Sequence, residues 1–248
     1  IPDQTRTAPI DVMFRTVYAE LAERVELLDF IIALGTHQPL SEEAINKRVG
    51  ISQSDRAAHY PQARFFNHEW KNPDQLIVAG TFSEEEVLEL SDGRMHAAVD
   101  VTINKMIYDY DLLLIIGPTF PHEVVGFSGG NKYLFPGIAG QEIIDMFHWL
   151  GALITNPLII GNKYTPVRAV VDRAAAFLPM ERRCMSLVVK GRGLAGLYIG
   201  TPEAAWEAAS DLSDKLHISY ETKSYHTVLS RAPLMYDDLW TGGKCMYK

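Results

Sequence analysis

Cysteine is scarce in this sequence of 248 residues, and there is no excess of basic charge. The two cysteines, Cys184 and Cys245, lie far apart and form no C-x-x-C pair. This spacing argues against a disulfide scaffold and against a zinc site built from thiolates. The net charge is −8, and no stretch gathers lysine and arginine on one face. Because neutralising phosphates requires such a face, we expect no nucleic-acid partner.

Long hydrophobic runs are also missing. The most apolar stretch, "YDLLLIIGPTF", has about half the length that a membrane span needs, and no secretion signal opens the chain. We therefore expect no membrane partner and, with so few cysteines, a cytoplasmic protein. The chain opens at Ile1 without methionine and stops at "GGKCMYK" without a helix-ending signal. This pattern predicts a chain that is truncated at both ends.

Strand-like and helix-like segments alternate along the sequence. Apolar spacing predicts a helix over residues 10–27, and "LLDFIIALG" is typical of a buried strand. Ser41 is a plausible helix start and Gly50 its stop, and Ser83 with Glu86 has the capping-box pattern. Further strands are expected in "QLIVAG", "AAVDVTIN", "YDLLLIIGPTF", "CMSLVVKG", "GLAGLYIG" and "YHTVLSRAP", and further helices in "QEIIDMFHWLGALI", "PVRAVVDRAAAFL" and the segment after Pro202. The alternation predicts an α/β fold with a largely parallel sheet and flanking helices.

Ligands of such folds bind at the carboxyl ends of the strands. Three unusual segments follow predicted strands: "GTH" at 35–37, "PHEVVGFSGGNK" at 121–132 and "RAPLMYDDLWTGGK" at 231–244. The second is rich in glycine, which lets backbone approach a bound group closely. Its Lys132 is not the lysine of a nucleotide-binding P-loop, because the glycine spacing fails and Tyr133 replaces the hydroxyl residue. Ser128 lies in G-x-S-G-G, which is one letter away from the nucleophile-elbow pattern of hydrolases.

Three histidines are candidates for chemistry, and for each the residues alone leave two interpretations open. His37 and His122 follow predicted strands, where an imidazole is either a general acid or base or a structural loop residue. His148 lies among apolar residues of a predicted helix and is either a buried core histidine or a metal ligand.

Four separated motifs, taken together, resemble the lactate racemase family. They are "DQTR" at 3–6, "ALGTH" at 33–37, "PHEVVGFSGGNKYLFPGIAG" at 121–140 and "FHW" at 147–149, and they occur in this order. Members of this family use a nickel-pincer nucleotide, a pyridinium mononucleotide whose two thiocarbonyl arms and one ring carbon hold Ni(II). The resemblance implies a racemase or epimerase of a 2-hydroxy acid, which is an isomerase. It also implies a two-domain protein, with residues 1–225 as the cofactor-binding domain and 226–248 as the start of a second α/β domain.

The resemblance also implies a role for each matched residue. Lys132 would carry the cofactor through a thioamide, and His148 would be the fourth nickel ligand, for which an imidazole is suited. His37 and His122 would be acid and base on opposite faces of the substrate. The segment Asp3, Gln4, Thr5 and Arg6 would contact the cofactor, as would Ser128, Gly129 and Gly130. We expect the glycines at 126, 129, 130 and 137 to let this loop close against the planar cofactor.

Near the end of the chain, "DLWTGGK" resembles the family's substrate-binding segment. Lys244 matches its lysine, whereas Thr241 stands where glutamine is common. Arg6, Thr241 and Lys244 would therefore bind a small-molecule 2-hydroxy acid, and the cofactor-synthesis proteins would be partners. Two alternatives remain open: a protein that carries the cofactor without racemising anything, and a metal-dependent hydrolase with His37, His122 and His148 as ligands.

Overall fold

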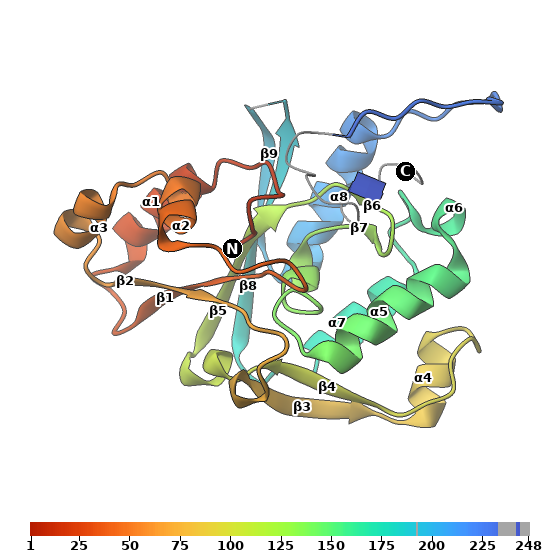
Figure 1. The fold of residues 1–248 in the computed structure, drawn as a ribbon, viewed down its shortest axis with the longest axis horizontal. Helices are drawn as coiled ribbons and strands as arrows, with labels where there is room; N and C mark the ends of the chain where they lie inside the picture. The colour runs from red at the N-terminus through yellow and green to blue at the C-terminus, as the bar shows by residue number, and fades with distance from the viewer. Residues whose placement is uncertain (192, 233–241, 244–248) are drawn as a thin grey trace.

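The computed structural model describes residues 1–191, 193–232 and 242–243 and confirms the α/β class (Figure 1). Strands β1 and β2 lie beside helices α1–α3, and strands β3 and β4 run along the opposite end of the molecule (Figure 1). The α-helices are α1 (Ile10–Leu21), α2 (Glu42–Val49), α3 (Gln53–His59), α4 (Glu84–Leu90), α5 (Gln141–Ile154), α6 (Asn156–Ile159), α7 (Pro166–Ala175) and α8 (Pro202–His217). The strands are β1 (Leu28–Ile32), β2 (Ala63–Asn67), β3 (Leu76–Phe82), β4 (Val99–Asn104), β5 (Leu112–Pro118), β6 (Pro121–His122), β7 (Gly126–Phe127), β8 (Glu181–Lys190) and β9 (Gly193–Gly200).

The strands pair in both directions, so the expected largely parallel sheet is only part of the picture. β1 pairs with β2 and β5 with β8 in parallel, whereas β3–β4, β6–β7 and β8–β9 are antiparallel. The β8–β9 hairpin turns at Gly191, whose φ of 62° is readily adopted only by glycine. In the described residues the strands form four small sheets, with β5–β8–β9 as the three-stranded one.

Several predicted helix ends are confirmed. The Ser41 hydroxyl accepts a hydrogen bond from the Ala44 N–H at the start of α2, and Gly50 ends that helix with φ 67°. The predicted helix over 10–27 is too long, because α1 ends at Leu21. Val25 and Leu27, beyond that end, are 39% and 48% exposed, so no core contact extends the helix.

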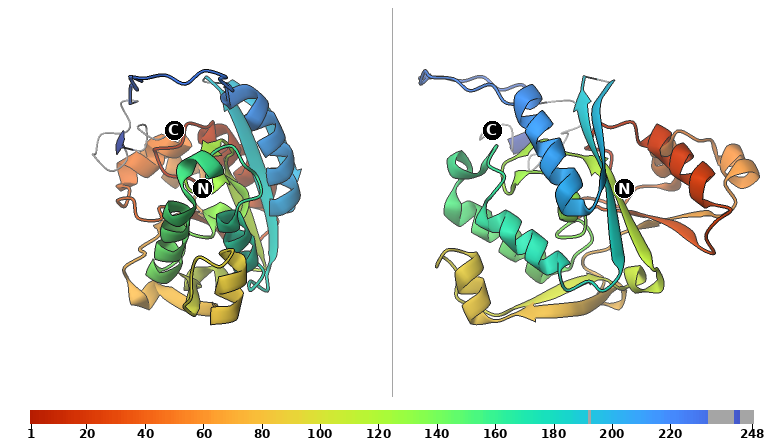
Figure 2. Two further views of the ribbon diagram at one scale, coloured as in Figure 1. Left: turned by 90° about the vertical axis from the view of Figure 1, so that its right-hand side faces the viewer. Right: turned by 180° about the vertical axis from the view of Figure 1, so that it is seen from behind.

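Three buried apolar clusters hold the strands in place, the smallest of them around Ile32, Leu34, Leu40 and Ile45. α1 covers β1, β2, β5 and β8 through an aromatic cluster that includes Phe14, Phe30 and Phe65. The largest cluster lies around α5 and α7, and Phe147 of α5 is fully buried in it. On the far side, α8 packs along β8 and β9 (Figure 2). The buried faces of these helices carry the apolar residues that their sequence spacing predicts.

Past α8, residues 218–232 form neither helix nor strand. The strand predicted in "YHTVLSRAP" is therefore wrong over its described part, 225–232. Val228 and Leu229 are 74% and 97% exposed, so nothing in the described chain packs against them. The domain boundary at 225 and the second domain that follows it remain predictions, and Thr241 and Lys244 lie outside the described residues.

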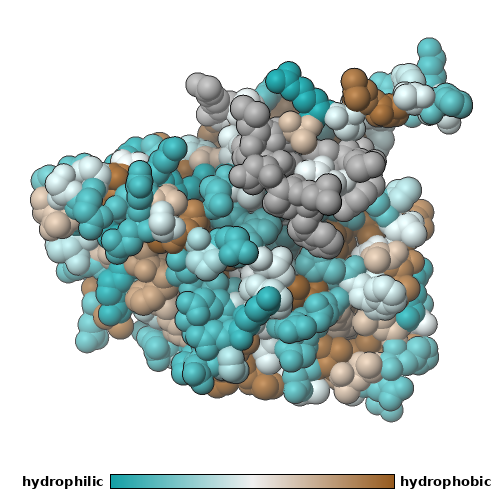
Figure 3. All heavy atoms as spheres, viewed as in Figure 1, coloured by the Kyte–Doolittle hydropathy of each residue, from teal (hydrophilic) through white to brown (hydrophobic). Residues whose placement is uncertain are grey.

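The face drawn in Figure 3 is mainly hydrophilic over α1–α3. Of the helices that the structure describes, none combines the length and the apolar character that crossing a bilayer requires.

Candidate functional site

One small cavity gathers most of the residues singled out in the sequence. Its volume is about 70 Å³, and it lies where β1 and β5 end and their loops begin. The predicted residues among its walls are Asp3, Arg6, His37, His122, Ser128, Gly129, Lys132 and His148. They come from separate stretches of the chain, so the fold alone brings them together, at the strand ends where an α/β fold is expected to bind ligands.

The "DQTR" segment forms one wall as a tight turn. Asp3 accepts hydrogen bonds from the Thr5 N–H at 2.9 Å and from the Thr5 hydroxyl at 2.6 Å. Arg48, at the end of α2, donates to the backbone oxygens of Pro2 at 3.3 Å and Arg6 at 2.6 Å. Arg48 was not foreseen, because its sequence neighbours mark it only as part of a surface helix. These two hydrogen bonds hold the turn in place, and burial lowers the pKa of the Arg48 guanidinium.

Asp3 and His37 form a hydrogen-bonded pair between Asp3 Oδ2 and His37 Nδ1. Burial alone would raise the pKa of Asp3, but the hydrogen bond from His37 and the charge of Arg6 outweigh it and hold that pKa well below its usual range. Asp3 is therefore an ionised carboxylate, which only accepts hydrogen bonds. The shared proton belongs to Nδ1 of His37, and in a neutral His37 the lone pair is on Nε2.

The surroundings of His122 have the opposite effect. This side chain is buried, and its Nδ1 accepts a hydrogen bond from the backbone N–H of Val124 at 3.1 Å. Because that peptide nitrogen is a donor, Nδ1 of a neutral His122 holds the lone pair and Nε2 carries the proton. The carboxylate of Glu123 lies 3.6 Å from the same Nδ1. In the neutral rings, Nε2 therefore holds the lone pair in His37 and the proton in His122.

Lys132 and His148 approach the cavity from two elements that pack together. The Lys132 Nζ atom lies 5.4 Å from the centre of the Phe147 ring. His148 follows Phe147 on α5, and its Nδ1 donates to the Ile144 carbonyl at 2.7 Å. This bond puts the lone pair of a neutral His148 on Nε2, the nitrogen that a metal would use. His148 is only partly buried, so the expectation of a fully buried core histidine is not met.

The glycines of the loop lie close to other parts of the protein. A Cβ on Gly126 would lie 1.8 Å from the Asn162 oxygen, and one on Gly129 would lie 2.2 Å from Thr119 Oγ1. At Gly130 and Gly137 the nearest atoms belong to Trp206 and to the Tyr133 backbone. The missing side chains therefore make room for the protein itself. The expectation that these glycines let the loop close against a planar cofactor stays a prediction.

The remaining predicted residues are less central. The Ser128 hydroxyl accepts from the Phe120 N–H and donates to the Pro118 carbonyl, so it closes the loop between β5 and β7. Gln4 is exposed, Thr5 supports Asp3, and Gly130 is buried under Trp206. Contact of Gln4, Thr5, Ser128 and Gly130 with a cofactor stays a prediction.

The sequence interpretation missed two residues that fix the loop from behind. Arg168 of α7 donates to the Phe127 carbonyl at 2.6 Å, and its guanidinium lies 4.0 Å from the centre of the Trp206 ring. The Trp206 Nε1 donates to the Ser128 carbonyl at 2.9 Å. A buried arginine in a helix between apolar residues is the only sequence signal that points to this role.

Within the described residues, no group of three or more histidine, cysteine, aspartate or glutamate side chains is placed to hold a metal ion. His37, His122 and His148 therefore line one cavity without forming a ligand set there. The hydrolase alternative, which needs these three histidines around one metal, has no such centre in this part of the chain.

Comparison with known proteins agrees with the fold and the motifs. A sequence profile described as the lactate racemase N-terminal domain matches residues 1–157. The lactate racemase of Lactiplantibacillus plantarum is 26% identical over 222 residues, which cover 86% of this chain and 47% of that protein. The lactate racemase of Thermoanaerobacterium thermosaccharolyticum is 26% identical over 157 residues, covering 62% of this chain and 32% of that protein. The chain thus spans about half the length of these relatives or less.

Two solved structures have the same fold. A crystal structure of a Thermotoga maritima protein aligns with a TM-score of 0.86 and 30% identity, over 96% of this chain and 59% of that one. The lactate racemase apoprotein of T. thermosaccharolyticum aligns with a TM-score of 0.66 and 22% identity, over 85% of this chain and 47% of that one. An α/β domain with a histidine- and lysine-lined cavity at its strand ends is the class that these observations define. The chain belongs to the lactate racemase family, through its N-terminal domain.

Proposed function

We propose that this protein is a racemase or epimerase of a 2-hydroxy acid that works with a nickel-pincer nucleotide. The observation that carries the proposal is the single cavity in which Lys132, His148 and the pair His37 and His122 meet. The motifs match each of these four residues to a residue that has a role in the family's chemistry. The hydrogen bonds of the three histidines are compatible with those roles.

The residues present fit such a cofactor by their chemistry. Lys132 supplies a primary amine for the thioamide, and His148 supplies an imidazole whose lone pair is on Nε2. The cavity, at about 70 Å³, is smaller than the roughly 300–1,000 Å³ typical of pockets that enclose a ligand. A mononucleotide held by Lys132 would therefore extend beyond these walls. When bound by these residues, such a cofactor would supply a reversible hydride acceptor for C2 of the substrate.

The two histidines then divide the proton transfers. Nε2 of His37 takes the proton of the substrate hydroxyl, and the ionised Asp3 stabilises the imidazolium that forms. His122, in its imidazolium form, would give the Nε2 proton to the oxygen of the 2-keto acid at the other face and become neutral. One inversion leaves His37 protonated and His122 neutral. The opposite enantiomer can react directly from that state, as racemisation in both directions requires.

The substrate carboxylate needs a cation near the histidines. Arg6 lines the cavity, and its guanidinium offers bidentate geometry to a carboxylate. Lys244, which lies outside the described residues, is the second proposed contact, with Thr241 beside it. The chain would obtain its cofactor from the cofactor-synthesis proteins, which are its proposed partners.

The test is to produce the chain together with the cofactor-synthesis proteins and to analyse it by mass spectrometry and metal analysis. We expect about one nickel per chain and a mass adduct on the peptide that contains Lys132. Lys132→Ala should remove the adduct, and Lys105→Ala, at an exposed position away from the cavity, should keep it. Zinc without an adduct would contradict the proposal. A protein that carries the adduct but exchanges the C2 hydrogen of no 2-hydroxy acid would be the carrier instead.

A further inference from the structure

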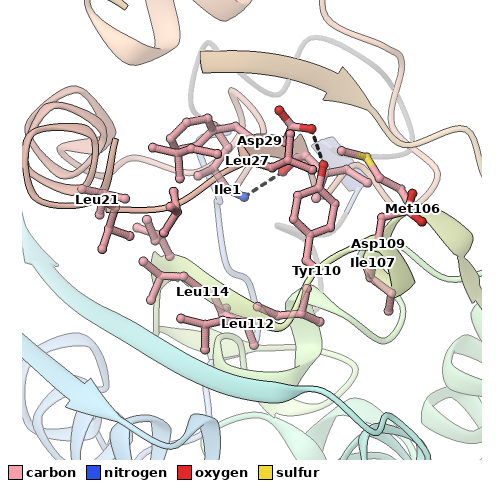
Figure 4. Close-up of a pocket in the computed structure, with 18 of the residues that line it drawn as sticks. Ile1, Leu21, Leu27, Asp29, Met106, Ile107, Asp109, Tyr110, Leu112 and Leu114 are labelled. Atoms are coloured by element: carbon pink, nitrogen blue, oxygen red, sulfur yellow. Dashed lines mark hydrogen bonds between the residues drawn. The ribbon is translucent and has the colours of Figure 1, made fainter. Parts of the chain in front are cut away.

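A second, larger cavity lies between the same two strands and extends to the ends at which they start. Its volume is about 480 Å³, and its walls include residues 28–31 of β1 and 112–116 of β5 (Figure 4). Successive side chains of a strand point to opposite faces of a sheet. A cavity that touches every residue in both stretches therefore lies in the plane of the sheet, between the two strand edges. We call this cavity the slot.

The edges that face the slot lack strand partners along most of their length. In the described chain, β1 pairs along its length with β2 and β5 pairs with β8, each on the side away from the slot. At the end of the slot where the strands start, the Tyr110 hydroxyl donates to Asp29 and so links the two strands (Figure 4). Open strand edges of this kind are a template for another strand.

The first residues of the chain already begin such a pairing. The Ile1 nitrogen donates to the Ile31 carbonyl at 2.8 Å, and the Ile1 carbonyl accepts from the Ala33 N–H at 2.9 Å. Pro2 and Ala33 form a parallel bridge. Ile1 thus makes the two hydrogen bonds of a residue inside a parallel strand, and backbone leading into it from the amino side would run through the slot.

Direction and polarity agree with this path. β1 and β5 both run toward the small cavity described above, because His37 follows β1 and His122 follows β5. One face of the slot is closed by Val17 and Leu21 of α1, and the other by Ile107, Leu134 and Ile138. A strand buried on both faces in a parallel sheet is apolar throughout.

We propose that the slot receives a β-strand. Its occupant is an extended, continuously apolar segment that leads into Ile1 and lies parallel to β1 and β5. It joins β2–β1 to β5–β8–β9 in one sheet. This strand ends where the Asp3 to Arg6 turn begins. It therefore fixes the position along the sheet at which Asp3 contacts His37. The inference rests on strand geometry and stands apart from the proposed chemistry.

The experiment is to fuse the hexapeptide Val-Ile-Val-Val-Ile-Val to the amino side of Ile1 in the full chain. The matched control has proline at the second and fourth positions of the hexapeptide, because proline cannot donate to a neighbouring strand. Hydrogen exchange is then followed by mass spectrometry on peptides that cover 28–33 and 112–118, with 141–154 in α5 as an internal reference. We expect exchange in both edge peptides to slow by roughly tenfold or more in the fusion alone.

A second variant checks that the slot itself is responsible. Leu114→Arg puts a charge into the slot and should abolish the protection, whereas Ile199→Arg, at a residue that is 65% exposed on β9, should keep it. If the fusion does not fold, the hexapeptide with a terminal lysine is added to the unmodified chain, and the same two edges should become protected together. Protection of one edge only, of neither, or equally with the proline control would overturn the proposal.

Discussion

His37 and His122 line one cavity, but their neighbours give them opposite hydrogen-bonding roles. His37 faces the carboxylate of Asp3, which fixes the proton on Nδ1, whereas His122 faces the N–H of Val124, which fixes the proton on Nε2. A neutral His37 therefore has a lone pair on Nε2, and a neutral His122 has an N–H there. The comparison shows that a residue type and a motif are not enough to assign the tautomer of a histidine, because the tautomer depends on the atom opposite Nδ1.

The largest expected effect comes from deleting either imidazole. In the protein that carries the cofactor, His37→Ala and His122→Ala should each lower racemisation by about 10²–10⁴-fold, because a positioned acid or base contributes that much. Both should keep nickel and the adduct on Lys132, whereas His148→Ala should lose nickel. His59→Ala, on the exposed helix α3, is the control. Equal loss of metal in all three cavity variants would contradict the division of roles.

The comparison is sharpened by replacing the two carboxylates that lie near the histidines. Asp3→Asn removes the charge that stabilises protonated His37, and a roughly 10²–10⁴-fold fall in kcat is expected, the upper value being that of a Ser-His-Asp triad with asparagine in place of aspartate. Glu123→Gln should cost less, because the peptide N–H of Val124 still fixes neutral His122. The measurement is kcat and its pH profile with nickel content held equal. A larger loss for Glu123→Gln would reverse our assignment of acid and base.

A stability measurement tests the Asp3 pair without any cofactor. The pKa of folded Asp3 lies below the value of about 3.9 for an unfolded aspartate, so the unfolded state binds the proton more readily. The stabilisation is therefore fully present above about pH 5 and is lost as the pH falls through the folded pKa. Urea unfolding from pH 7 down to acid should show this slope. Asp3→Asn should flatten it, and Asp92→Asn, at an exposed left-handed turn residue, should not.

The smallest effect concerns a group away from both histidines. Cys184 is buried in β8, and burial raises the pKa of its thiol to about 11. At pH 8 only about one thiol in a thousand is then a thiolate, the reactive form. In a Cys245→Ser background, labelling by N-ethylmaleimide should stay slow until the protein unfolds. Labelling at the rate of an exposed cysteine would show that the β5–β8 region opens readily.

Much of the fold follows from local patterns in the sequence. The helix over 141–154 is found from its apolar periodicity alone, because Gly140 and Thr155 at its ends supply no side-chain cap and no glycine stop. β2 is missed because "ARFFN" is short and its pairing with β1 bridges a separation of more than thirty residues. The direction of β9 depends on the turn at Gly191, which a list of strands does not reveal.

The candidate site divides in the same way. Motif order is enough to select Lys132, His37, His122 and His148, and the structure places all four on one cavity. The bond between Asp3 and His37 joins residues 34 positions apart, and no local pattern reports it. The close packing of the glycines could not be predicted for a related reason: Gly126 lies against Asn162 and Gly130 against Trp206, both distant in sequence.

The two residues that hold the glycine-rich loop from behind have a consequence for where this protein can be divided. Arg168 and Trp206 supply donors to the consecutive carbonyls of Phe127, Ser128 and Gly129, and both lie beyond residue 157, where the family profile ends. A chain that ended at the profile's edge would lose the side-chain donors to all three carbonyls and keep only the Lys132 N–H, 3.3 Å from the Gly129 oxygen. The match to the profile is thus shorter than the stretch of chain that holds the loop beside Lys132, which runs through α8.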